Sequence, residues 1–257
     1  MDQQPTRYIN QSLRILSATL LLLVASVSFA GSHFLLPENH QSTYSVSKYG
    51  AEVAEIKSNF QYKNQQINYT SVATATGVTA MFFKEVITET SLLFWPENES
   101  LQSPQQTSYV LRHKKKSKKN QEIKFHWAET DHVDITSTYR KKVSTVSSNQ
   151  QAWSSQLIPI LMSNNLLHDK NTTKNSFLIA NKGRLVNYNY QFEGKENITL
   201  DNKIQPCVKY KIRKQDSDRF SYVWLSEDYF YLPLKIEQYK GDELNVSMML
   251  KHFKLLQ

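Results

Sequence analysis

A run of basic side chains is the densest chemical feature of the sequence. Six positive charges fall within eight residues, on Arg112, Lys114, Lys115, Lys116, Lys118 and Lys119. Such a cluster attracts anionic groups, and each Lys or Arg contributes about 1 kcal/mol near a charged membrane. No aromatic residue is interleaved with these charges, so we expect no nucleic-acid partner. A solvated hairpin tip, kept polar against aggregation, is the alternative interpretation.

Other reactive residue types form no catalytic or cofactor motif. The sequence has no Gly-x-Ser-x-Gly motif, and its six glycines form no phosphate-binding loop. The acid pair Glu227-Asp228 is assigned to a turn, because Asp stabilises turns through local hydrogen bonds. His126 and His132, with Asp131 and Asp134, match no recurrent zinc spacing. We therefore expect a non-enzymatic protein with no metal or other cofactor.

Residues 1–30 have the pattern of a secretory signal peptide. Two arginines precede an apolar run from Ile15 to Phe29, which is shorter than the about 20 residues of a membrane helix. Small residues at Ser28 and Ala30 predict cleavage after Ala30; an uncleaved anchor is the alternative. We expect a periplasmic or secreted protein. No cysteine follows the cleavage site, so lipid attachment there is excluded.

Net charge and cysteine content limit the classes of binding partner and the disulfide chemistry that we expect. The formal net charge of +8 favours acidic partners such as anionic lipid or an acidic envelope protein. The single cysteine, Cys207, excludes an internal disulfide framework. In an oxidising compartment a lone thiol is usually a small buried hydrophobe, and this is the role we predict for Cys207.

The elements that position these residues are mostly strands. Alternating patterns over 220–224, 232–239 and 244–250, separated by turn-forming residues, predict a three-strand antiparallel meander. Similar patterns recur from Thr43 onward, and Val143–Gln150 has the composition of a polar linker. We therefore predict an all-β, mainly antiparallel domain over 43–257, built as one strongly curved sheet or half-open barrel. Residues 31–42 are expected to form a flexible N-terminal segment.

One stretch has a helical period. Apolar residues recur at Trp153, Leu157 and Ile160 between Gln150 and Leu167, which predicts a helix that packs on the sheet and is bent at Pro159.

Four aromatic residues form a second candidate site. If the sheet curves and the helix caps its concave side, Trp153 would face Phe220, Tyr222 and Trp224 across a hollow suited to an acyl chain or a hydrophobic protein tail. The alternative is that these rings only fill the core.

The order of these features resembles a bacterial envelope family called domain of unknown function 3108. The residues that carry the resemblance, over about 43–253, are Tyr44, Gly50, Gly77, Trp224, Asp228, Pro233 and Ile236. The resemblance implies a periplasmic, strongly curved antiparallel sheet similar to the half-barrels of outer-membrane lipoprotein carriers. It implies no reaction and no catalytic residues.

Two functions therefore remain open. The first is an envelope protein that binds a lipid, a lipoprotein or another apolar ligand on the concave side of its sheet. The second is an interaction module that docks to an envelope protein or to an anionic membrane or surface polymer. It would use an edge strand or the basic hairpin tip. A hydrolase with catalytic groups assembled from distant positions is a remote third.

Overall fold

The computed structural model describes residues 34–82, 84–95, 103–128 and 132–256. The predicted signal peptide and its cleavage position lie outside these residues. The elements, in chain order, are β1 (His40–Lys48), β2 (Ala51–Lys63), β3 (Gln66–Ala75), α1 (Gly77–Phe82), β4 (Val86–Phe94), β5 (Gln105–His113), η1 (Ser117–Lys119), β6 (Gln121–Trp127), β7 (Val133–Tyr139), β8 (Lys142–Ser148), β9 (Ala152–Ser154), η2 (Ser155–Leu157), α2 (Ile158–His168), β10 (Lys174–Asn181), β11 (Arg184–Leu200), β12 (Lys203–Lys214), β13 (Arg219–Ser226), η3 (Glu227–Tyr229), β14 (Leu232–Lys240) and β15 (Glu243–Leu255).

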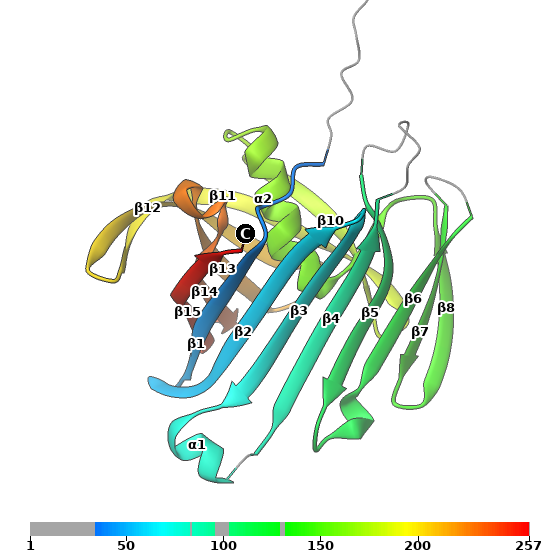
Figure 1. Ribbon diagram of the computed structural model, residues 1–257, viewed down its shortest axis with the longest axis horizontal. Coiled ribbons are helices and arrows are strands. Elements are labelled where there is room, and N and C mark those ends of the chain that lie inside the picture. The colour runs from blue at the N-terminus through cyan, green and yellow to red at the C-terminus, as the bar shows by residue number, and fades with distance from the viewer. Residues whose placement is uncertain (1–33, 83, 96–102, 129–131, 257) are drawn as a thin grey trace, which may run out of the picture. The chain divides into compact units, whose positions relative to one another are not determined.

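All fifteen strands belong to one sheet. Its order is β8-β7-β6-β5-β4-β3-β2-β1-β15-β14-β13-β12-β11-β10-β9, and the sheet curls into a nearly closed barrel with α2 inside the curve (Figure 1). Neighbouring strands run antiparallel except for β9 and β10, which are parallel. The predicted all-β, mainly antiparallel class is confirmed, as is the meander, which forms β13, β14 and β15.

The predicted helix is shorter than its pattern indicated. Ala152–Ser154 form strand β9, which pairs with β10, and the α-helix begins only at Ile158 after one 3-10 turn. Pro159 therefore starts the helix instead of bending it. The physical reason is that proline has no N–H to donate, which is harmless in the first turn of a helix and costly in its middle.

Two further boundaries differ from the sequence prediction. The polar stretch after residue 142 is the edge strand β8, not a linker, because it pairs with β7 through backbone hydrogen bonds that do not depend on apolar side chains. The residues before β1 are packed: Phe34 contacts Trp153 with 6.0 Å between ring centroids, and the Asn164 side chain accepts a hydrogen bond from Leu35 N at 2.8 Å. Ordered structure thus begins before Thr43.

The largest core cluster lies between α2 and the inner face of the sheet. Leu157, Leu161 and Leu166 pack there against strand residues such as Phe60 and Leu225. Helix α2 has eleven residues, or about 16 Å of length, whereas a strand of thirteen residues such as β2 extends about 43 Å. The helix therefore covers only part of the inner face.

A buried polar network holds the β9 segment inside the curve. Gln106 on β5 accepts a hydrogen bond from Ser154 N at 2.7 Å and donates one to Ser154 Oγ at 2.9 Å. Gln156 donates to the Tyr69 carbonyl at 3.2 Å. Because buried polar groups are costly when unpaired, these bonds fix the chain that leads into α2. In the described part of the chain no helix has the length and apolarity to span a bilayer.

Candidate functional site

The inner face of the sheet can be followed residue by residue from the pairing register. Phe60, in the core cluster under α2, lies opposite Tyr69, and directly opposed residues share a face. Along β3, Ser71 and Ala73 therefore continue the face that Tyr69 occupies. The pairs continue into β4, where Glu89 lies opposite Ser71.

This face also carries apolar side chains that stay partly exposed, and among those named next Ile236 packs against the edge of the cluster that contains α2. We call these residues the inner strip: Val46, Ile56, Ala73, Ile87, Leu111, Ile236 and Met248. All seven are intermediate in exposure, whereas Ile67, on the same face of β3 but in the core cluster with α2, is 1% exposed. Apolar surface in a concave position is the usual lining of a ligand site.

One carboxyl group lies within the inner strip. Glu89 accepts a hydrogen bond from Tyr109 Oη at 2.8 Å. Burial raises the pKa of Glu89 above its ordinary value, against the opposing effects of this hydrogen bond and of His113. Glu89 thus adds a polar group to an otherwise apolar surface.

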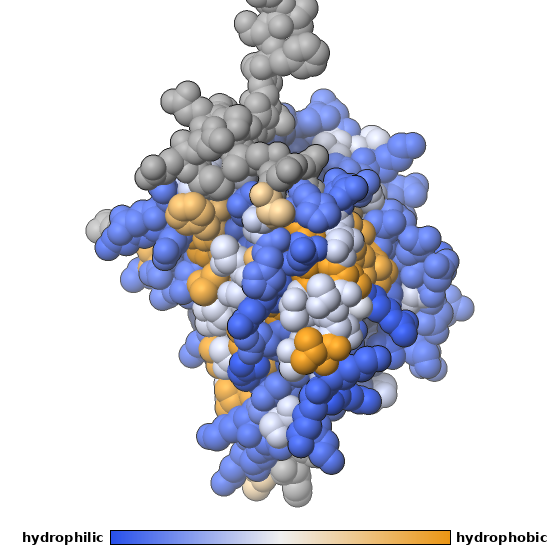
Figure 2. All heavy atoms as spheres, turned by 90° about the vertical axis from the view of Figure 1, so that its right-hand side faces the viewer, coloured by the Kyte–Doolittle hydropathy of each residue, from blue (hydrophilic) through white to orange (hydrophobic). Residues whose placement is uncertain are grey.

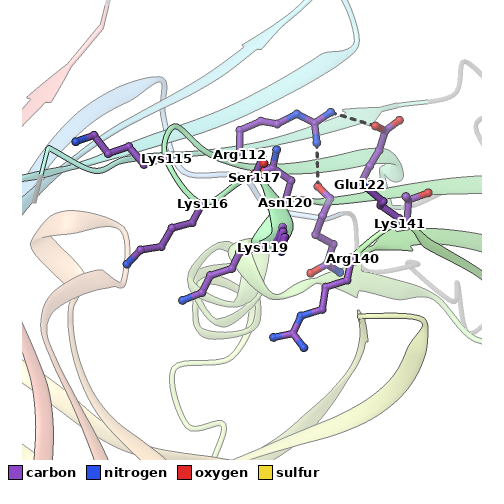
Figure 3. A pocket seen from close by; sticks show the side chains of 12 residues that line it. Arg112, Lys115, Lys116, Ser117, Lys119, Asn120, Glu122, Arg140 and Lys141 are labelled. Carbon is purple, nitrogen blue, oxygen red and sulfur yellow. Dashed lines mark hydrogen bonds and ion pairs between the residues drawn. The ribbon is translucent and has the colours of Figure 1, made fainter.

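A cluster of cations lies where β5, β6, β7 and β8 make their turns, at the lower end of the sheet in Figure 1. We call it the basic rim: Lys115, Lys116, Lys118, Lys119, Arg140 and Lys141. These residues line a hollow of about 960 Å³. Figure 3 shows that Lys116, Lys119 and Arg140 point in one direction, away from Arg112 and Glu122. Seven cations including Arg112 line this hollow, against a single acid.

Acidic partners close to the rim are already engaged. Glu122 lies 3.1 Å from the Arg112 guanidinium, on the outer face, and Glu85 lies 3.4 Å from the His113 ring. Within the described ranges, no ion pair involves the six side chains of the basic rim. Their mutual repulsion is therefore uncompensated by protein carboxylates, which is the electrostatic condition of an anion site.

The local fold explains how so many lysines share one turn. The chain makes a single 3-10 turn at η1, where Lys119 N donates to the Lys116 carbonyl at 2.7 Å. Asn120 then accepts a hydrogen bond from His113 N at 2.7 Å and closes the loop. Lys114, which belongs to the same basic run in the sequence, lies in a neighbouring hollow of about 370 Å³ with Arg112 and Asn120.

Arg140 and Lys141 were missed by sequence reasoning. They form the two-residue turn between β7 and β8, with φ values of 52° and 64°. Left-handed turns of this kind favour Asn-Gly, because other residues are strained there. The other two-residue hairpin turns with left-handed residues in the described chain each contain Asn, Asp or Gly. A turn made of two long cationic residues is unusual and could have indicated a functional site. It can be recognised only when the position of the turn is known.

Two buried polar groups next to the rim have no hydrogen-bond partner within the described residues. Gln121 is 3% exposed, lines the hollow and has an unpaired amide nitrogen. Ser137, on the neighbouring strand and the same face, is 2% exposed with an unpaired hydroxyl. Unpaired buried donors cost free energy in the absence of a partner.

The four aromatic residues proposed from the sequence do not form one lining. Trp153 is 5% exposed and belongs to the core cluster with α2. Val223 and Leu225 share that cluster, so the alternating residues Phe220 and Tyr222 lie on the opposite face of β13. Trp224 also alternates with them and packs in a second cluster. The structure thus separates Trp153 from the other three rings.

Cations flank those three rings instead. Lys209 Nζ lies 4.8 Å from the Trp224 ring and Lys235 Nζ lies 4.5 Å from it. Trp224 Nε1 donates to Glu196 at 2.7 Å. Hydrogen bonds from Lys209 and then Trp224 hold the pKa of Glu196 below its usual value. The charged and polar groups around Trp224 on this face therefore already have partners within the protein.

The remaining candidates have structural roles. Cys207 is a free, buried thiol, as predicted, and burial raises its pKa to about 11. Glu227 lies in the 3-10 turn η3 and pairs with Lys170. His132 lies 3.7 Å from Asp134; Asp131 is outside the described residues, and no metal-binding group of three is found within them.

Two solved structures are similar in fold. A beta-barrel-like protein of the DUF1849 domain of unknown function from Brucella abortus has a TM-score of 0.56 and 9% identity, covering 87% of this chain and 100% of that one. A Bacteroides fragilis protein described as exported, with a YmcC-like fold, has a TM-score of 0.33 and 10% identity, covering 86% of this chain and 99% of that one. The first supports the barrel-like fold.

No curated protein matches the sequence. A family model does match: it is described as Protein of unknown function (DUF3108), and it covers residues 41–250. This agrees with the resemblance seen in the sequence over about 43–253. The chain belongs to the DUF3108 family of proteins of unknown function.

Proposed function

We propose that this protein is an exported, non-enzymatic envelope protein that binds a lipid, a lipoprotein or another apolar ligand on the inner strip. The observation that carries the proposal is the partial exposure of these seven apolar side chains on the concave face. Fully burying an exposed Val, Leu, Ile or Met side chain contributes about 1.5–3 kcal/mol. The side chains of the inner strip are already half-buried, so each contributes only part of this when an acyl chain covers it, and the binding energy is a sum over several of them.

The two edges of the sheet are packed against each other. The sheet ends at β8 on one side and β9 on the other. Figure 2, which looks at the side where β8 lies in Figure 1, shows hydrophobic residues and residues of intermediate hydropathy near the middle of the face, with hydrophilic residues around them. Val146 of β8 packs on a cluster that contains Ala152 of β9 and Ala180 of β10, and Ser144 of β8 lies close to Gly183 in the β10–β11 turn. We therefore expect no entry route for the ligand between these edges. The export proposal itself depends on residues 1–30.

Blocking the inner strip tests the proposal. Ala73 lies on the inner face, and the next residue, Thr74, is exposed on the outer face of the same strand. We expect Ala73→Trp to weaken binding of a fluorescent fatty acid by about tenfold or more, because the indole occupies the ligand's space. Thr74→Trp is the matched control and should change the affinity by less than about twofold.

Native mass spectrometry of the purified protein provides an independent measurement. We expect mass adducts that correspond to co-purifying lipid, and their loss in Ala73→Trp. A clean apo mass together with no fatty-acid uptake by the unmodified protein would contradict the proposal. The docking module, acting through the edge strand β8 or the basic rim, would then be the better explanation.

A further inference from the structure

We propose that the basic rim binds the negatively charged headgroup of the ligand whose acyl chain lies on the inner strip, so that the ligand is an anionic amphiphile. This inference rests on the proposed function and adds the chemical class of the ligand. A phosphate or carboxylate group would supply the charge.

The first step of the argument is the charge itself. Six cationic side chains from two turns that are distant in sequence, around η1 and between β7 and β8, line one hollow of about 960 Å³. Nearby carboxylates pair with Arg112 and His113. Figure 3 shows Lys116, Lys119 and Arg140 oriented together. Arg140 also lies over the Tyr139 ring, 5.3 Å from its centroid. Cations gathered around one space raise the positive potential there, and this potential attracts an anion.

The second step is the polar group behind the charges. Gln121 lines the same hollow, is 3% exposed and has an amide nitrogen without a partner in the described ranges. Buried amide donors are normally satisfied, so an oxygen-rich ligand would supply what the fold does not. Phosphate and carboxylate oxygens are acceptors of the required kind.

The third step links the rim to the inner strip. Gln121 lies directly opposite Leu111 of the strip in the β5–β6 pairing, and Leu111 lies opposite Glu89 in the β4–β5 pairing. Directly opposed residues on antiparallel strands are about 4.5–5.5 Å apart. One molecule with a charged head and an apolar tail can therefore contact both surfaces, which neither a free phosphate nor a neutral hydrocarbon could do.

The fourth step is the strained turn. Arg140 and Lys141 both have left-handed φ values, and Asn-Gly would relieve that strain. Strained residues cluster at functional sites; in this chain Phe230 and Tyr231 are also left-handed, outside the rim, so the strain supports the proposal only together with the charge. The turn thus places two cations at the rim although their backbone conformation is unfavourable.

The experiment compares two lysolipids that carry the same lauroyl chain. Lysophosphatidylglycerol is anionic and lysophosphatidylcholine is zwitterionic, and both are titrated below their micelle concentrations by calorimetry. We expect the purified protein to bind the anionic lipid more tightly. In the variant Lys116→Gln/Lys119→Gln/Arg140→Gln, the Kd for the anionic lipid should rise by about 100-fold, at about fivefold for each cation. The Kd for the zwitterionic lipid should change by less than about twofold.

A matched variant controls for the loss of charge. Lys203→Gln/Lys214→Gln/Lys240→Gln removes three exposed cations that lie outside the rim, and it should leave both affinities within about twofold of the unmodified protein. The double variant Arg140→Asn/Lys141→Gly removes rim charge while favouring the turn. It should weaken binding of the anionic lipid selectively although its fold is intact.

The outcomes separate the two proposals. Equal affinity for both lysolipids, or a rim variant that weakens both equally, would overturn the headgroup inference and leave the apolar site standing. Absence of binding by either lysolipid would overturn both proposals. Binding to phosphatidylglycerol vesicles is the last measurement. If the rim variant loses vesicle binding but keeps its affinity for the monomeric anionic lysolipid, the cations act at a membrane surface. That outcome would contradict the headgroup inference.

Discussion

The inner face of the barrel has two halves that use the same strands in different ways. On β3, Ile67 is 1% exposed in the core cluster with α2, while Ala73 on the same face is partly exposed. Two things change along the strand: the side chains become smaller, from Ile67 and Tyr69 to Ser71 and Ala73, and α2 covers only part of the strand's length. One half is therefore a conventional core, and the other resembles the lining of a binding site.

The comparison also explains where polar groups are tolerated. Under the helix, Gln106 and Ser154 are buried and bonded to each other. At the other end, Gln121 and Ser137 are equally buried but unpaired within the described residues. Unpaired buried polar groups are costly, and a binding site can leave donors to be satisfied by its ligand. Ser226, fully buried next to Leu225 of the core cluster, also has an unpaired hydroxyl within the described residues, so the contrast holds for Gln106 and Ser154 and not for every buried polar group.

The largest expected effect is a difference in the free energy of unfolding between the two halves. We expect Ile67→Ala to cost about 3 kcal/mol, because it opens a cavity under α2. The same change at Ile87, in the inner strip, should cost about 1 kcal/mol, since less surface is buried there. Urea denaturation of the two variants measures both. Equal costs would show that the strip is as tightly packed as the core and would remove the basis of the comparison.

A smaller effect of opposite sign is expected at the β7–β8 turn. Arg140→Asn/Lys141→Gly should raise the free energy of unfolding by about 1–2 kcal/mol, because left-handed backbone is costly for long side chains and favourable for Asn-Gly. Thermal and urea unfolding provide the measurement. The turn between β11 and β12, already Asp201-Asn202 with φ values of 48° and 61°, is the reference: Asn202→Gly there should gain less. A destabilised turn variant would contradict the strain argument.

The smallest expected effect is a change in pH dependence. Burial raises the pKa of Glu89 in the folded protein, so its contribution to stability is fully present below its unfolded pKa, near 4.5, and is lost as pH rises through the folded pKa. Glu89→Gln mimics the protonated form. We expect this variant to be more stable than the unmodified protein at pH 7, with the difference shrinking as pH falls toward 4.5. A difference that does not vary with pH would show that Glu89 is not responsible.

Much of the fold was predictable because strand patterns are local. Alternation over Phe220–Trp224 and the two following runs, with turn-forming residues between them, predicted the meander of β13, β14 and β15. The element boundaries that were wrongly predicted are those that depend on pairing with a neighbouring strand. β8 has a polar sequence and exists because β7 pairs with it; β9 has a helical period and is extended because β10 and Gln106 hold it.

The candidate site was predictable only in part, for the same reason. The Lys-rich tip is contiguous in the chain, so its charge was evident from residue types alone. Arg140 and Lys141 are more than twenty positions away and join the tip only through the pairing of β5, β6 and β7. The aromatic set failed because alternation reveals that Phe220 and Tyr222 share a face without revealing which side of the sheet that face is on.

Taken alone, the amino-acid sequence determined the all-β class, the C-terminal meander, the family and the basic tip, because periodicity, turn chemistry and charge are properties of neighbouring residues. The tertiary structure decided which face is concave, how far α2 covers it and which cations meet at the rim. Those features depend on sheet curvature and strand register, which are fixed by contacts between residues far apart in the chain.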